Sequence, residues 1–184
     1  MQASLTLQNY RCFLQPATVQ LRKGFTAFVG VNNAGKSAFM RFLLEFRPLL
    51  QQLINTDYTR NSLNYAQSYN GCLHVLDQQE VFSNLNYRPI ELTIEITTSP
   101  EDLLGCATLK LVVTIHRNMT CDALFYIDGL NTKTLGANLI GHILSFTGHS
   151  QVNVEPLFDT LTLLTQTLYI GPFRNTINVG TKTD

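Results

Sequence analysis

One short segment, residues 30–37, constrains this chain more than any other. It reads Gly-Val-Asn-Asn-Ala-Gly-Lys-Ser, which fits the phosphate-binding loop pattern of Gly, four residues, Gly-Lys, then Ser or Thr. Gly30 and Gly35 allow the backbone to turn so that successive N–H groups point at a polyphosphate. Lys36 can reach the outer phosphates, and the hydroxyl of Ser37 can bind Mg²⁺. The motif therefore predicts a binding site for a nucleoside polyphosphate.

The flanking residues favour this interpretation over a glycine-rich turn that merely looks similar. Residues 25–29 form an apolar run suited to a buried strand, and it ends directly on Gly30. Beyond the motif, apolar residues at helical spacing predict a helix from Gly35 to about Phe46. Pro48 indicates a kink or a restart before a second helical piece over residues 49–54. Strand, loop and helix in this order suit phosphate binding, because a helix N-terminus carries partial positive charge.

The remainder of the chain predicts a run of strands and two further helices. Alternating apolar residues indicate strands over 90–97, 109–115 and 124–127, and their short links predict an antiparallel meander. Residues 55–87 are polar and predict an insertion or loop region with some helix. The apolar residues of 135–146 recur at helical spacing, and residues 157–164 predict another short helix with Pro156 in its first turn.

The composition excludes some classes of protein but does not identify a binding partner. Thirteen basic and thirteen acidic residues cancel, so net charge gives no general attraction to nucleic acid or to anionic membranes. The four cysteines are scattered without a C-x-x-C pair, which disfavours a zinc site. The N-terminus is unlike a signal peptide, and no apolar run approaches the ~18 residues that would span a bilayer. We expect a soluble, cytoplasmic chain with no membrane partner.

Three segments together resemble a known family. Residues 5–13 read Leu-Thr-Leu-Gln-Asn-Tyr-Arg-Cys-Phe, and residues 23–30 lead into a phosphate loop with two asparagines. Both resemble the opening of ABC-type ATPase heads, with the SMC/RecF/OLD-like branch as the most similar group. Residues 169–174, Tyr-Ile-Gly-Pro-Phe-Arg, resemble a stretch of OLD-like ATPases in which a Leu stands at the position of Phe173.

This resemblance implies a fold and a set of ligands. The fold would be α/β, a P-loop NTPase whose ABC-ATPase-like N-terminal lobe has a mixed sheet around the P-loop helix plus an antiparallel strand meander. Residues 1–184 would form the N-terminal part of such an ATPase domain, and the ligands would be ATP and Mg²⁺.

The resemblance also assigns roles to individual residues. Arg11 would lie near the nucleotide, with a solvated charge at a strand end as the alternative. Arg174 would approach the γ-phosphate, with a simple turn charge as the alternative. The expected catalytic residues are thus Lys36 and Arg174, and the expected metal ligand is Ser37. The expected nucleotide-binding residues are Arg11, Gly30, Asn32, Asn33, Ala34, Gly35, Lys36, Ser37 and Ala38.

Two further motifs of such a head have no match in the chain. One is a Walker B strand that ends in Asp-Glu, and the other is a Ser-Gly-Gly signature that completes the site of a partner head. Residues 124–127 followed by Asp128 come nearest to Walker B, but Gly129 stands where Glu is needed, and Asp-Gly favours a hairpin turn. We therefore expect binding without efficient turnover by this chain alone.

Three functional hypotheses follow. In the first, the missing C-terminal half of the head or a partner subunit supplies both motifs. Two heads would then sandwich ATP and serve a DNA-directed or nuclease activity in DNA repair or anti-phage defence. In the second, the chain is a non-catalytic, nucleotide-responsive interaction subunit that a partner chain completes. In the third, it is a self-contained NTPase that uses Asp128 for Mg²⁺.

Overall fold

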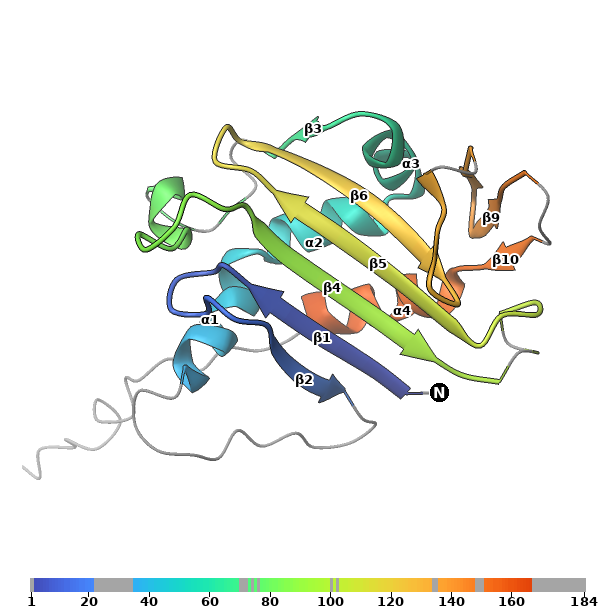
Figure 1. The fold of residues 1–184 in the computed structure, drawn as a ribbon, viewed down its shortest axis with the longest axis horizontal. Coiled ribbons are helices and arrows are strands. Elements are labelled where there is room, and N and C mark those ends of the chain that lie inside the picture. Colours follow the sequence, from blue (N-terminus) through green and yellow to red (C-terminus); the bar gives the residue numbers. More distant parts are fainter. Residues whose placement is uncertain are drawn as a thin grey trace, which may run out of the picture.

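An antiparallel sheet forms one layer of the protein and helices form the other (Figure 1). The computed structural model describes residues 2–21, 35–69, 73, 75, 77–99, 101, 103–133, 136–147 and 151–166. Within them the main sheet has the order β2-β1-β4-β5-β6-β3, with β7 pairing at the other end of the β6 edge. Its strands are β1 (Gln2–Gln8), β2 (Ala17–Leu21), β3 (Gln67–Ser68), β4 (Ile90–Thr97), β5 (Thr108–Ile115), β6 (Thr120–Ile127) and β7 (Leu130–Asn131).

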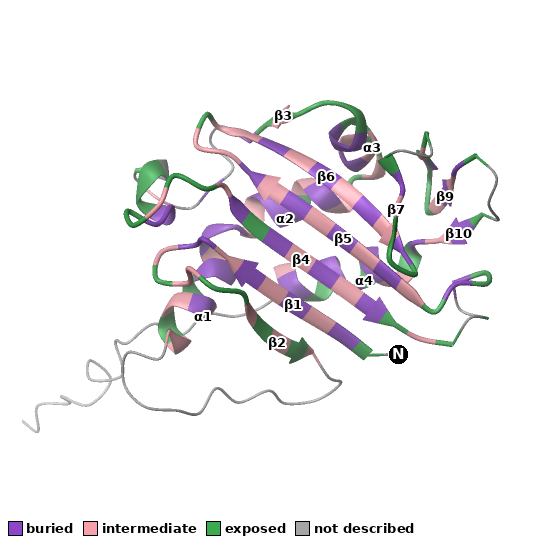
Figure 2. Ribbon diagram, in the orientation of Figure 1, coloured by how far each residue is buried: buried purple, intermediate pink, exposed green. Residues whose placement is uncertain are grey.

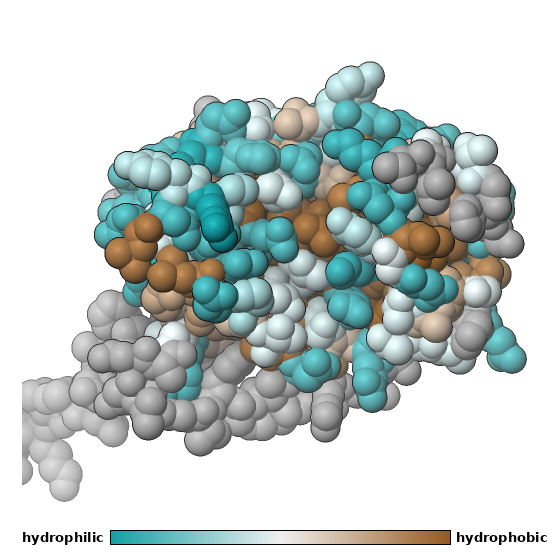
Figure 3. Space-filling model, in the orientation of Figure 1, coloured by the Kyte–Doolittle hydropathy of each residue, from teal (hydrophilic) through white to brown (hydrophobic). Residues whose placement is uncertain are grey.

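Alternation along the strands decides which face of the sheet is covered. Every second side chain of β4, β5 and β6 is buried, whereas those between are mainly half-buried (Figure 2). The buried set packs against the helical layer, and the opposite face carries many polar side chains with scattered apolar ones (Figure 3). The meander predicted from period-two alternation is confirmed, because β4, β5 and β6 pair consecutively and antiparallel.

In the described residues, four α-helices and one 3₁₀ turn accompany the sheet. They are α1 (Lys36–Glu45), α2 (Arg47–Ile54), α3 (Thr56–Asn64), η1 (Gln78–Val81) and α4 (Glu155–Thr165). The chain changes direction at Phe46, and Pro48 lies in the first turn of α2, where its missing N–H leaves no helical bond unmade. The predicted helix to about Phe46 and the restart after it are both confirmed. The helix predicted over residues 157–164 is also present, as α4 with Pro156 in its first turn.

The helix predicted over residues 135–146 is wrong. This stretch contains β8 (Asn138–Ile140) and β9 (Ile143–Ser145), which form a small sheet with β10 (Val152–Asn153). The turn between β8 and β9 is two residues long and begins at Gly141, whose φ of 57° suits a tight hairpin. Leu139 and Ile140 before this turn, and Ile143 and Leu144 after it, are spaced as apolar residues are on one face of a helix.

Several expected elements fall on residues outside the described ranges. The strand expected at 25–29 and the segment 169–174 that carries part of the family resemblance lie there, so the mixed sheet around the P-loop helix stays a prediction. The described pairings are all antiparallel. In the polar region 55–87 the described residues include α3, β3 and η1. No helix in the described part of the chain is long and apolar enough to cross a membrane.

Candidate functional site

Helix α1 begins directly at the end of the phosphate-loop motif. Gly35 precedes the helix with φ 83° and ψ 1°, a left-handed conformation that favours glycine, and Lys36 is the first helical residue. Gly35 has no side chain that could bond to the first amide groups of the helix, and the first turn holds no acidic residue. In α3, by contrast, the Asn55 side chain accepts from the amides of Asp57 and Tyr58 at 2.9 and 3.2 Å. The N-terminus of α1 therefore suits an anion better than that of α3 does.

Four of the predicted site residues can be placed in the structure at this helix start. They are Gly35, Lys36, Ser37 and Ala38; the side chain of Ser37 is exposed, and Lys36 and Ala38 are half-buried. An exposed hydroxyl in the first turn fits the role of a Mg²⁺ ligand, because this cation prefers oxygen donors and retains several waters. The other predicted loop residues, Gly30, Asn32, Asn33 and Ala34, and also Arg174, lie outside the described residues.

The segment that follows β1, residues 9–13, runs along α1. Asn9 and Arg11 have φ values of 59° and 48°, so the chain reverses direction within a few residues. The Asn9 side chain donates to the carbonyl of Pro89 at 3.0 Å and accepts from the Asn86 amide at 3.1 Å. These bonds tie the segment to the chain just before β4, which is remote from it in sequence.

A buried carboxylate links residues 9–13 to the last turn of α1. Glu45 is only 5% exposed, and its Oε2 accepts from the hydroxyl of Tyr10 at 2.6 Å while its Oε1 accepts from Nη2 of Arg11 at 2.6 Å. Nε of Arg11 also donates to the Tyr10 hydroxyl at 3.1 Å. Burial, and next the hydrogen bond and the negative charge of Glu45, raise the pKa of Tyr10 far above its ordinary value, so this hydroxyl stays protonated.

Arg11 is therefore held at the end of α1 that is remote from the phosphate loop. Its partner Glu45 comes nine positions after Lys36 (45 − 36), which is roughly 14 Å along a helix that rises ~1.5 Å per residue. The guanidinium is partly accessible, with 23% of its side chain exposed. Contact of Arg11 with a nucleotide stays a prediction, and its observed contact is the ion pair with Glu45.

Aromatic rings fill the space between residues 9–13 and α1. Tyr10 meets Phe42 and Phe46 edge-on, with ring centroids 5.4 and 5.8 Å apart, and Phe13 meets Phe39 edge-on at 6.2 Å. Such pairs are worth ~1 kcal/mol each beyond the area they bury. These ring contacts were not predicted from the sequence. Their signal was present, since aromatics at 39, 42 and 46 share one face of the helix at spacings of three and four.

Asp128, the nearest Walker B candidate, is engaged in a turn. Asp128 and Gly129 have φ values of 47° and 83° and form the two-residue link between β6 and β7, so the hairpin predicted from Asp-Gly is confirmed. Oδ1 of Asp128 accepts from the backbone amides of Ala107 and Thr108 at 3.0 and 2.8 Å and from the Thr108 hydroxyl at 3.1 Å. The carboxylate therefore serves the connection between β6 and the start of β5.

The strand register places Asp128 far from residues 9–13. The backbone amide of Asp128 donates to the carbonyl of Thr108 at the start of β5. Thr108 is opposite Thr97 on β4, and Thr97 is opposite Gln2 on β1. Residues 9–13 follow Gln8, six residues further along β1, so about 20 Å of strand separates the two levels. This separation argues against the third hypothesis, in which Asp128 binds Mg²⁺ at the phosphate loop.

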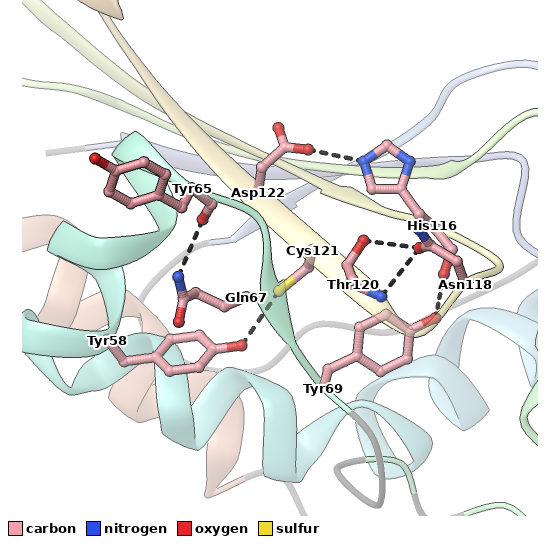
Figure 4. A network of polar contacts seen from close by, with 9 residues as sticks. All are labelled: Tyr58, Tyr65, Gln67, Tyr69, His116, Asn118, Thr120, Cys121 and Asp122. Carbon is pink, nitrogen blue, oxygen red and sulfur yellow. Dashed lines mark hydrogen bonds and ion pairs between the residues drawn. The ribbon is translucent and has the colours of Figure 1, made fainter.

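A second polar cluster lies at the β5–β6 hairpin (Figure 4). Nε2 of His116 is 2.7 Å from Oδ2 of Asp122, and the hydroxyl of Tyr69 donates to the backbone carbonyl of His116. Tyr58 on α3 contacts the thiol of Cys121 at 3.2 Å. Each of these bonds joins the hairpin to itself, to α3 or to the chain around β3, so the cluster is best explained as part of the fold.

Comparison with known families adds one finding. A family model described as AAA ATPase domain matches residues 1–116. The match takes in the phosphate-loop motif, residues 9–13, the helices α1 to α3 and the strands β1, β4 and β5. No curated protein gives a match to the chain.

Proposed function

The chain belongs to the AAA ATPase domain family and is a nucleotide-binding protein, and we propose that it forms the ATP- and Mg²⁺-binding part of an ABC-type head of the SMC/RecF/OLD-like branch. In this proposal the triphosphate lies in the loop of residues 30–37 with Lys36 on its outer phosphates, and Ser37 holds Mg²⁺. Arg11 and Arg174 contribute from outside the loop, Arg174 toward the γ-phosphate.

The observation that carries this proposal is the junction at Gly35. A left-handed glycine leads directly into a helix whose first residues are Lys and Ser, without an acidic side chain in the first turn. That arrangement brings helix amides, a lysine and a hydroxyl to one point, as binding of a metal-chelated polyphosphate requires. Positioning and charge stabilisation do most of the work of phosphoryl transfer, so such a junction is the part of the machinery that this chain would contribute.

The remaining groups for turnover are proposed to come from elsewhere in the assembly. We propose that a further part of the head, or a partner subunit, carries the Walker B carboxylates and the signature, and that two heads enclose ATP between them. Nucleotide state would then control a DNA-directed or nuclease activity, in DNA repair or in defence against phage. The location would be the cytoplasm.

One observation favours a second candidate function. Asp128 is held by two amides and a hydroxyl at the other end of the sheet, which leaves the chain without its nearest Walker B carboxylate. A nucleotide-responsive subunit that binds ATP without hydrolysing it, and that docks a partner when loaded, would need no such group. The two candidates differ in whether addition of the complementary half restores turnover.

The test is ATP affinity with and without Mg²⁺, measured with turnover on the 184-residue chain. We expect binding that Mg²⁺ strengthens, little turnover, and a loss of affinity of about a hundredfold in Lys36→Ala, since a charge contact to phosphate is worth ~3 kcal/mol. Lys133→Ala is the matched control, because it removes an exposed lysine from the link after β7. Equal ATP affinity in Lys36→Ala and in the unaltered chain would refute nucleotide binding at this loop.

A further inference from the structure

The ring of Phe13 lies against the backbone of the phosphate loop at Gly35. A Cβ atom built on Gly35 would be 2.7 Å from Cε1 and 2.8 Å from Cζ of Phe13. Carbon atoms in van der Waals contact stay ~3.5–4.0 Å apart, so the ring leaves no space for any side chain at position 35. Gly35 is thus required for two separate reasons, its φ of 83° and the approach of this ring.

The ring has little freedom to move aside. Phe39 on α1 meets its edge at 6.2 Å between centroids, and Tyr10 stacks beside it at 6.4 Å. The backbone amide of Phe13 donates to the carbonyl of Tyr10 at 2.8 Å, which fixes the turn that carries the ring. Tyr10 is itself held by Glu45 at the other end of α1. The position of Phe13 therefore depends on a chain of contacts that runs the length of the helix.

We propose that Phe13 is a positioning residue for the phosphate loop. Its ring forms the wall against which Gly35 rests, and it thereby sets the direction of the amide groups of Lys36 and Ser37 at the start of α1. Phe13 touches no nucleotide in this scheme and acts through Gly35. The inference rests on the proposed nucleotide binding at residues 30–37.

The first experiment measures Mg²⁺-ATP affinity for Phe13→Ala and Phe13→Leu. We expect about a tenfold loss in Phe13→Ala, because misdirected amides forfeit about one hydrogen bond to a charged phosphate. Phe13→Leu keeps an apolar wall at the same place and should retain most of the affinity. Phe158→Ala is the matched control, because it removes a buried phenylalanine of α4 and should leave ATP affinity unchanged.

A second measurement reads the contact without any nucleotide. The aromatic ring contributes a ring-current shift to the Gly35 α-protons, and this contribution should vanish from the NMR spectrum in both Phe13 variants. A double-mutant cycle introduces Gly35→Ala into the unaltered chain and into Phe13→Ala. The left-handed strain of alanine is present in each, so only the clash with Phe13 separates them, and Gly35→Ala should destabilise the unaltered chain more than it destabilises Phe13→Ala.

The outcomes separate this proposal from the proposed function. Unchanged ATP affinity in Phe13→Ala, an equal loss in Phe158→Ala, or additive effects in the cycle would each overturn the positioning role. Failure of the nucleotide site itself would instead appear as ATP affinity that does not depend on Lys36, even where the Gly35 proton shifts respond to Phe13.

Discussion

The hydroxyl of Tyr10 donates to Oε2 of Glu45 at 2.6 Å and thereby joins the end of β1 to the last turn of the helix that follows the phosphate loop. Both groups are buried, and Nη2 of Arg11 donates to the other carboxylate oxygen, Oε1, at 2.6 Å. A buried carboxylate is costly unless its charge and its lone pairs are satisfied. Here a cation and a phenol meet that requirement together, so α1 has one preferred position relative to the sheet.

Removal of this carboxylate should destabilise the protein strongly. Glu45→Ala leaves a buried phenol and a partly buried guanidinium without their acceptor, and we expect a loss of about 3 kcal/mol in the free energy of unfolding. Glu45→Gln loses the charge and one of the two acceptor oxygens but keeps the other, so its expected cost is smaller, about 1–2 kcal/mol. Urea denaturation with a common m-value would measure both losses.

Arg41 provides the control for this prediction. Its Nε is 3.9 Å from Oε1 of Glu45, but 53% of its side chain is exposed. Exposed pairs of this kind contribute about 0.5 kcal/mol or less, so Arg41→Ala should change stability little. A cost for Arg41→Ala as large as that for Glu45→Ala would mean that the stabilisation comes from general charge balance and not from the buried bonds.

Asp128 should be dispensable for Mg²⁺ and important for its turn. Asn tolerates the left-handed conformation and keeps an acceptor oxygen, so Asp128→Asn should cost about 1 kcal/mol or less and leave Mg²⁺-ATP affinity unchanged. Asp128→Ala should cost more, about 2–3 kcal/mol, because strain and lost bonds to Ala107 and Thr108 add together. Isothermal titration with and without Mg²⁺ decides the question, and loss of the Mg²⁺ effect in Asp128→Asn would revive the self-contained NTPase.

Sequence patterns predicted those elements whose environment is uniform along their length. The strand over residues 90–97 alternates because one face of the sheet is covered and the other is open, and Pro48 identified the break between α1 and α2. Residues 139–144 were misassigned because two apolar pairs fit a hairpin and a helix equally well at short range. Gly141 was the one residue in this stretch that indicated a hairpin, since glycine disfavours a helix and suits a turn.

The conformation and contacts of residues 9–13 could not be predicted in the same way. They depend on left-handed conformations at Asn9 and Arg11 and on a bond from Asn9 to Pro89, which is remote in sequence. Glu45 did give a partial signal, because an acid three residues after Phe42 falls on the apolar face of the helix. Such a residue requires a partner, but periodicity cannot say that the partners are Tyr10 and Arg11.

Arg117 should hold the chain at residues 83–86 in place. Its Nη2 donates to the carbonyls of Ser83 and Asn86, and its guanidinium lies over the ring of Phe82 at 4.7 Å. We expect Arg117→Ala to speed amide exchange at Ser83 and Leu85 about tenfold, as loss of one or two bonds to a charged group would do. Arg117→Lys should restore little of the protection, because an ammonium group lacks the planar guanidinium that lies over the ring of Phe82.

The matched control is Arg88→Ala, an exposed arginine of the same loop. Its removal changes net charge equally but leaves the two carbonyl bonds in place, so exchange at Ser83 and Leu85 should stay as in the unaltered chain. Equal acceleration in Arg88→Ala and Arg117→Ala would attribute the protection to charge and not to the two bonds from Arg117.

Alkaline pH should weaken the fold through Cys106. Burial raises the pKa of this thiol from 9.0 to about 11, with the charge of Asp128 as a second cause. Between pH 9 and 11 the unfolded chain releases a proton that the folded chain retains, so the free energy of unfolding falls as pH rises, by about 2 kcal/mol at pH 11.

Urea denaturation across this range should show the decline, and Cys106→Ala should show a shallower one. Part of the decline should persist in that variant, because burial also raises the pKa of Tyr10 and Tyr69. An identical pH dependence in Cys106→Ala would mean that the thiol ionises as readily in the folded chain as in the unfolded one.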